Sequence, residues 1–234
     1  MPLLRPILTL SIITTLIFGF SVSGDEPQTK SPEAKPLAFA EDSSWTPSHF
    51  GGDGPIEMKD GVLSLGFGDP LTGVRWEGDF PKQDYEVSLE ARRVGGFDFF
   101  CGLTLPLVDQ RFSLVLGGWG GSLIGLSSID GLDASNNETM LIRNFEKNRW
   151  YKVRVRVTKE KINVWLDDEQ IIEIECKGRV FDVRSEMLES LPIGIAAFQC
   201  ESEVRNVRVM PSKLESDPVV KPAPAAEAAP GVAR

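Results

Sequence analysis

Hydrophobic and polar residues alternate with a period of two along much of the chain between residues 45 and 211. Every second residue of 151–157 (YKVRVRV) is apolar, and the residues between them are basic. The segment 85–92 (YEVSLEAR) alternates in the same way, with acidic, hydroxyl and basic side chains between the apolar ones. A period of two predicts strands with one buried and one solvated face. In 162–175 (INVWLDDEQIIEIE) two such runs flank Asp167-Asp168, which predicts a hairpin.

Further short apolar runs extend this pattern over most of the folded body. Only 183–190 is compatible with a helix, and that segment is short. About ten strands separated by turn signals predict an all-β fold, a two-sheet antiparallel jelly-roll sandwich. The additional strands are expected at 61–65, 97–105, 112–116, 122–126, 140–145, 193–198 and 204–209.

Both ends of the chain differ in composition from this body. Residues 1–24 contain one basic residue, an apolar run from Ile7 to Phe20 and then small residues, which is the layout of a signal peptide. The apolar run is shorter than the ~20 residues that span a bilayer, so cleavage is expected, with a secreted or periplasmic mature chain that has no integral membrane domain. The alternative is an uncleaved N-terminal anchor. Residues 25–44 and the Pro/Ala-rich 212–234 are expected to be a disordered linker and tail. The folded domain is predicted at 45–211.

The charge of the chain limits its expected macromolecular partners, and its cysteine and histidine content limits the expected disulfides and metal sites. The formal net charge of −9, without a cluster of Lys and Arg, excludes nucleic acid as an expected partner. Three cysteines, Cys101, Cys176 and Cys200, leave two alternatives open, which are one disulfide or buried free thiols. With a single histidine and no C-x-x-C spacing, a zinc site is not expected.

The segment Gly117–Gly121 (GGWGG) is the first candidate for chemistry. Glycines on both sides of Trp119 allow positive φ angles and a close approach of another chain or a ligand. One interpretation is a tight hairpin with Trp119 packed on the sheet edge. The other holds Trp119 outward as a platform on which a sugar ring stacks.

Carboxylates supply candidates for catalysis, since a glycosidase needs two of them across its site. Asp98 lies within GGFDFF, where apolar surroundings would raise its pKa and suit it to acid or base chemistry. The alternative is that Asp98 points to water from an ordinary strand. Asp130 is the second catalytic candidate. Arg111 could pair with Asp98 or bind a polar ligand.

An oxygen-rich segment follows, 127–139 (SSIDGLDASNNET). Ser127 and Ser128 are candidate ligand-binding residues at its start. Hard cations such as Ca²⁺ favour this density of oxygen ligands, so calcium is the one cofactor that the pattern indicates. The alternative is a self-hydrogen-bonded loop, because Asp-Gly and Ser-Asn-Asn are also turn sequences. The candidate metal ligands are Asp130, Asp133, Asn137 and Glu138.

Four segments in order resemble one known family. Together these segments resemble the 3-keto-disaccharide hydrolase-type domains. They are IEMKDGVLSL, QDYEVSLEARR with GFDFFCGLTL, NRWYKVRVRVTKEKINVWLDDEQIIEI, and PIGIAAFQCESEVRNVRVMP. The resemblance implies a concanavalin A-like jelly roll, related in fold to laminin G-like lectins and glucanases. It implies a polar residue near the end of the strand before the last, and Gln199 is the candidate for that position.

These observations predict an exported carbohydrate-binding or carbohydrate-processing domain whose partner is a glycan or small saccharide. Under the enzyme hypothesis the substrate is a 3-keto-glycoside or a related disaccharide. The alternative is a non-catalytic adhesion or scaffold module of the cell envelope that binds a protein partner.

Overall fold

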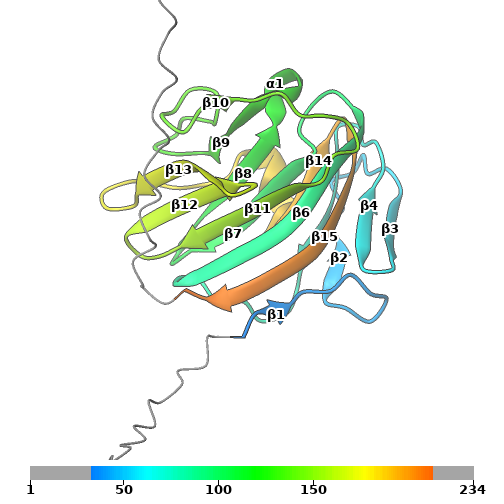
Figure 1. Cartoon of the computed structure of the whole chain (residues 1–234), viewed down its shortest axis with the longest axis horizontal. Helices are drawn as coiled ribbons and strands as arrows, with labels where there is room; N and C mark the ends of the chain where they lie inside the picture. Colours follow the sequence, from blue (N-terminus) through cyan, green and yellow to red (C-terminus); the bar gives the residue numbers. More distant parts are fainter. Residues whose placement is uncertain (1–32, 213–234) are drawn as a thin grey trace, which may run out of the picture. The chain divides into compact units, whose positions relative to one another are not determined.

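The structure is a computed structural model that describes residues 33–212. The predicted signal peptide, the first part of the predicted linker and nearly all of the predicted tail lie outside the described residues. The described part consists of two antiparallel β-sheets in a jelly-roll arrangement (Figure 1). The predicted fold class is therefore confirmed.

The larger sheet, sheet A, has the strand order β13-β12-β11-β6-β15-β4-β3, and β1 pairs with β15. Its strands are β1 (Lys35–Pro36), β3 (Ile56–Lys59), β4 (Val62–Leu65), β6 (Tyr85–Gly96), β11 (Tyr151–Val157), β12 (Lys161–Leu166), β13 (Glu169–Glu175) and β15 (Cys200–Pro211).

The smaller sheet, sheet B, has the order β10-β9-β8-β7-β14-β5-β2. Its strands are β2 (Trp45–Pro47), β5 (Leu71–Trp76), β7 (Cys101–Leu107), β8 (Gln110–Gly117), β9 (Leu123–Ser127), β10 (Leu141–Ile142) and β14 (Gly194–Phe198). Two short segments complete the fold, the four-residue turn α1 (Gly118–Gly121) and the 3-10 helix η1 (Ser185–Ser190).

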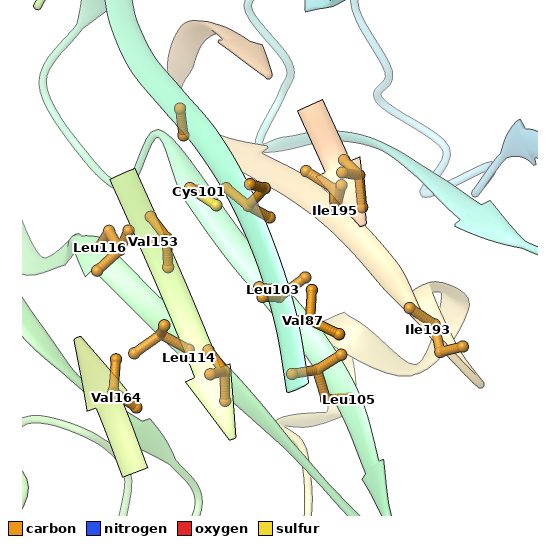
Figure 2. Packing of buried hydrophobic residues seen from close by; sticks show 14 of the residues in the cluster. Val87, Cys101, Leu103, Leu105, Leu114, Leu116, Val153, Val164, Ile193 and Ile195 are labelled. Atoms are coloured by element: carbon orange, nitrogen blue, oxygen red, sulfur yellow. The ribbon is translucent and has the colours of Figure 1, made fainter. Parts of the chain in front are cut away.

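The main core lies between the two sheets. Val87, Val153 and Val164 of sheet A face the leucines and isoleucines of sheet B (Figure 2). The period of two places these side chains inward, and each is at most 2% exposed. Burial of such a side chain contributes about 1.5–3 kcal/mol, so this layer is the main source of stability. The facing residues are Leu103, Leu105, Leu114, Leu116 and Ile195 of sheet B and Ile193 directly before β14.

The outer face of sheet A carries the charges that the alternation assigned to solvent. The guanidinium groups of Arg154 and Arg156 bind the Glu86 carboxylate at 3.1 and 2.9 Å, across neighbouring strands. Trp165 lies beneath them, with the Arg154 guanidinium carbon 3.7 Å from its ring centroid. The basic strand therefore forms an ion-paired face with its acidic neighbour.

Two expected strands begin or end elsewhere. The strand expected at 97–105 starts only at Cys101, because residues 97–100 form a bend between β6 and β7. The strand expected at 140–145 is reduced to β10, two residues that pair with Leu123 and Ile124 of β9. The helix-compatible segment forms η1, and the Asp167-Asp168 hairpin turn forms between β12 and β13.

The folded body begins before Trp45, which corrects the predicted linker boundary. Lys35 and Pro36 pair with Val209 and Arg208 of β15. Leu37 and Phe39, 1% and 3% exposed, belong to the main core. The Pro- and Lys-rich composition hid these two apolar residues, which fill the open side of β15.

The three cysteines are buried free thiols, the second of the two alternatives. Burial raises the pKa of Cys101 to about 12 and, with the nearby Glu160 charge, that of Cys176 to about 11. They are protonated at neutral pH and act as small apolar side chains.

Within residues 33–212, no helix has the length and apolar character needed to cross a bilayer.

Candidate functional site

A cavity of about 220 Å³ lies on the outer face of sheet B, the face opposite the main core. Three of the sequence candidates, Asp98, Trp119 and Ser127, lie in its lining although they are distant in the chain. The remaining lining residues are Phe99, Ser113, Val115, Arg184, Glu186, Met187 and Phe198.

Small side chains in the middle of sheet B leave room for this cavity. β8 presents Leu114 to the core and Ser113 and Val115 to the outer face, and β14 places Ala196 on the same outer face. A Cβ added to Gly102 of β7 would lie 2.9 Å from the Phe99 ring, so Phe99 closely covers this glycine. The cavity therefore follows from the alternation of side chains along the strands, which places small residues on the outer face of sheet B.

The floor of the cavity is apolar. Phe99 and Phe198 are far apart in the chain, and their ring centroids are 5.6 Å apart. Met187 of η1 packs with them in a second hydrophobic cluster, separate from the main core. The residue pattern gave no sign of this cluster, because its members, which also include Leu71 and Ala196, come from segments far apart in the chain.

Trp119 stands at the rim in a strained turn. The turn α1 has left-handed backbone at Trp119 (φ 49°, ψ 53°) and at Gly120 (φ 89°), and 43% of Trp119 is exposed. Gly117 has φ 77°, and a Cβ there would lie 2.4 Å from the Arg93 guanidinium. Glycine is required on both sides of the tryptophan, and the turn holds the indole outward.

Arg93 holds this turn in place and was missed in the sequence. Its Nη2 donates hydrogen bonds to the carbonyl oxygens of Asp98 (3.0 Å), Gly117 (3.3 Å) and Gly121 (2.9 Å). These bonds connect the bend after β6 to the turn after β8. The sequence feature that could have indicated this role is the pair Arg92-Arg93, because Arg93 is a charged residue at an inward-facing position of an alternating strand.

Asp98 supports the same turn from the other side. Its Oδ1 accepts the backbone N–H of Phe99 at 2.8 Å and its Oδ2 accepts that of Gly120 at 3.0 Å. Asp98 therefore lies in the loop, which corrects the assumption, common to both sequence interpretations, that it sits on a strand. Its carboxylate lines the cavity while it orders Trp119.

Two charged residues of the 184–186 segment, Arg184 and Glu186, form an exposed rim of the cavity. The Arg184 guanidinium binds the Glu186 carboxylate and also, at 2.9 Å, the Asp133 carboxylate. Partial burial raises the pKa of Glu186, but hydrogen bonds from its own backbone and Arg184 outweigh this and lower it overall. Glu186 is therefore ionised at neutral pH. Neither residue was a sequence candidate, since the short helical segment suggested only structure.

The two serines of the lining differ in their hydrogen bonding. The Ser113 Oγ is 2.8 Å from the Thr104 Oγ1, and the two hydroxyls form one hydrogen bond. The Ser127 Oγ is buried and has no hydrogen-bond partner within residues 33–212. Ser127 lines the cavity, whereas its neighbour Ser128 bonds to the Asp182 backbone outside it.

Two other predicted ligand-binding residues are not in the lining. Arg111 pairs with the Asp182 carboxylate at 2.8 Å, not with Asp98. Gln199 lies between β14 and β15 with φ 44°, and its backbone bonds to Pro70 and Phe97. The tertiary structure thus separates both residues from the cavity.

The acidic segment 127–139 is organised by hydrogen bonds and ion pairs. Asp130 and Glu138 both bind Arg179, and a backbone bond from Val180, followed by Arg179, lowers the pKa of Asp130. The buried Asn137 donates its side-chain N–H groups to backbone carbonyls of the same region. This arrangement is that of a self-hydrogen-bonded loop.

The predicted calcium ligands do not fit a calcium site as they are arranged. The carboxylates of Asp130 and Glu138 pair with Arg179, and the carboxylate of Asp133 pairs with Arg184. Among residues 33–212 no group of three or more His, Cys, Asp and Glu side chains could hold a metal ion. Asp130, the second catalytic candidate, is likewise outside the cavity lining.

Fold and site together define a concanavalin A-like jelly roll with a cavity on the outer face of its smaller sheet. A family model described as the 3-keto-alpha-glucoside-1,2-lyase-like domain matches residues 41–210, most of the chain. The chain belongs to this family, which confirms the family resemblance of the sequence.

Solved structures show the same fold at low identity, and no curated protein matches the sequence. A Bacillus licheniformis β-glucanase has a TM-score of 0.51 and 8% identity over 80% of this chain and 100% of its own. A structure from work on endo-acting O-glycanases of the human gut microbiota has a TM-score of 0.53 and 12% identity, over 76% and 95%.

Replacement of Arg93 by Met should loosen the Trp119 turn. The change removes the donor for three backbone carbonyls, and we expect the free energy of unfolding to fall by about 1–3 kcal/mol. Urea denaturation measures this loss. Arg111→Met is the matched control, because its exposed ion pair contributes less than about 1 kcal/mol. Equal losses in the two variants would contradict the role given to Arg93.

Proposed function

We propose that this domain binds a glycan in the cavity on sheet B, with one sugar ring stacked on Trp119. The observation that carries the proposal is the exposed indole, held by a strained turn that both Arg93 and Asp98 stabilise. An indole offers an apolar plane and a polar N–H, which suit the C–H face and the hydroxyls of a sugar. A platform ordered before binding also reduces the entropy lost on binding.

The charged rim supplies the complementary polar contacts. Arg184 is exposed and Glu186 is partly exposed, so both can hydrogen-bond hydroxyl groups of a ring stacked on Trp119. Membership of the 3-keto-alpha-glucoside-1,2-lyase-like domain family supports a carbohydrate as the ligand.

The site of action is outside the cytoplasm in this proposal. The signal-peptide layout of residues 1–24 supports export and cleavage. Mass spectrometry of the protein recovered from the medium or periplasm of a producing cell should show a chain that starts near Asp25. A chain that keeps Met1 and stays in the cytoplasm would refute export.

Trp119→Ala should weaken glycan binding by about 5- to 30-fold, the loss of about 1–2 kcal/mol typical of a removed aromatic contact. A glycan array identifies the ligand, and titration calorimetry then compares the dissociation constants of both proteins.

The matched control for this variant is Trp150→Ala. Trp150 stacks against Arg92 and Arg205 of sheet A and is not in the cavity lining. Glycan binding should survive in this control. Unchanged affinity in Trp119→Ala would refute stacking, and a chain that binds no glycan but retains a protein partner would support the scaffold alternative.

A second candidate function, cleavage of a 3-keto-glycoside, is favoured by the family and by two carboxylates in one lining, Asp98 and Glu186. Glu186 is the candidate base, because its carboxylate is ionised at neutral pH and is not bound by two backbone N–H groups as that of Asp98 is. The ionised carboxylate would accept a proton from the substrate or from water.

Glu186→Gln should then lower turnover of 3-keto-glycosides by at least about 100-fold, the usual contribution of a general base. Release of monosaccharide or an elimination product is measured by mass spectrometry. Glu189→Gln, on the same helix and outside the lining, is the matched control and should keep full turnover. Activity that persists in Glu186→Gln would remove Glu186 from the reaction.

A further inference from the structure

We propose that the cavity selects a glycosyl residue that carries a methyl group, such as a 6-deoxy or an N-acetylated sugar. The methyl group would lie on the floor formed by Phe99, Phe198 and Met187. This inference rests on the proposed function and concerns which class of sugar the site binds.

The size of the cavity limits the ligand to about one ring. Its volume of about 220 Å³ is smaller than the roughly 300–1,000 Å³ of pockets that enclose drug-sized ligands. A longer glycan would therefore place one residue in the cavity and continue past the Trp119 rim. Phe97, 59% exposed and next to Asp98 in the same bend, is available for contact outside the cavity.

The floor disfavours a sugar that directs a hydroxyl group into it. Phe99, Phe198 and Val115 have no polar side-chain atom, and the Met187 sulfur is only a weak acceptor. A hydroxyl placed there loses its water without gaining a partner, whereas a methyl group buries apolar surface at no such cost.

The polar groups of the lining are engaged or exposed, apart from the Ser127 hydroxyl, which is buried without a hydrogen-bond partner among residues 33–212. Both oxygens of Asp98 accept backbone N–H groups, and the Ser113 hydroxyl is paired with Thr104. Arg184 and Glu186 remain at the rim with solvent-exposed donors and acceptors. A bound ring is therefore oriented with its hydroxyls toward Arg184, Glu186 and the unpaired Ser127 hydroxyl, and with its apolar substituent toward the floor.

The experiment compares sugars that differ only in this substituent, with the full chain as the protein. Methyl fucoside is paired with methyl galactoside of the same configuration, and methyl N-acetylglucosaminide with methyl glucoside. Calorimetry or NMR titration should show at least about 10-fold tighter binding of the methyl-bearing member of at least one pair. A difference in affinity within the fucoside pair would indicate a 6-deoxy ligand, and a difference within the glucosaminide pair would indicate an N-acetylated ligand.

Val115→Thr tests whether the floor is responsible. The change keeps the volume nearly constant and adds a hydroxyl to the lining, so the preference for the methyl group should fall severalfold. Val180→Thr, at an exposed position outside the lining, should keep the full preference. The sugar comparison on the unaltered chain needs no variant, so it decides even if Val115→Thr does not fold.

The outcomes separate this inference from the proposed function. Equal affinities within both pairs, with binding that Trp119→Ala weakens, would overturn the methyl preference and leave the glycan site intact. Absence of binding to every saccharide of the array would overturn the proposed function and, with it, this inference.

Discussion

The two-residue alternation of the strands is the constraint on which both the core and the cavity depend. Each strand of sheet B must fill the space between the sheets with one set of side chains and leaves the other set outside. In β8 the inner set includes Leu114, and the outer set includes Ser113 and Val115. Because large residues stabilise the inner face, small ones can line the outer face without loss of the fold.

Residues of the loops next to sheet B complete the cavity. The Arg93 guanidinium binds carbonyls of two loops that are about twenty residues apart, and Asp98 binds the N–H of Gly120 across the same gap. Charge-assisted hydrogen bonds of this kind stabilise the left-handed backbone at Trp119, which would otherwise cost of order 1–3 kcal/mol. The exposure of the indole is thus maintained by the polar contacts of Arg93 and Asp98 with this turn.

The acidic loop shows how tertiary contacts change the meaning of a sequence pattern. Its carboxylates have the composition of a calcium loop, but Arg179 and Arg184 reach them from about fifty residues away and neutralise them. Arg184 also binds Glu186, so the loop is connected to the cavity rim through one guanidinium group. The segment therefore supports the site without lying in its lining, apart from Ser127 at its start.

The sequence by itself determined the all-β jelly roll, the hairpin at Asp167-Asp168 and the glycine-framed turn at Trp119, because these depend on local periodicity and backbone freedom. The tertiary structure alone decided that Phe99, Met187 and Phe198 form one floor and that Leu37 and Phe39 join the core. It also decided that Arg111 and Gln199 lie apart from the cavity. Such contacts depend on the order in which strands pair within each sheet, and no repeat along the chain encodes that order.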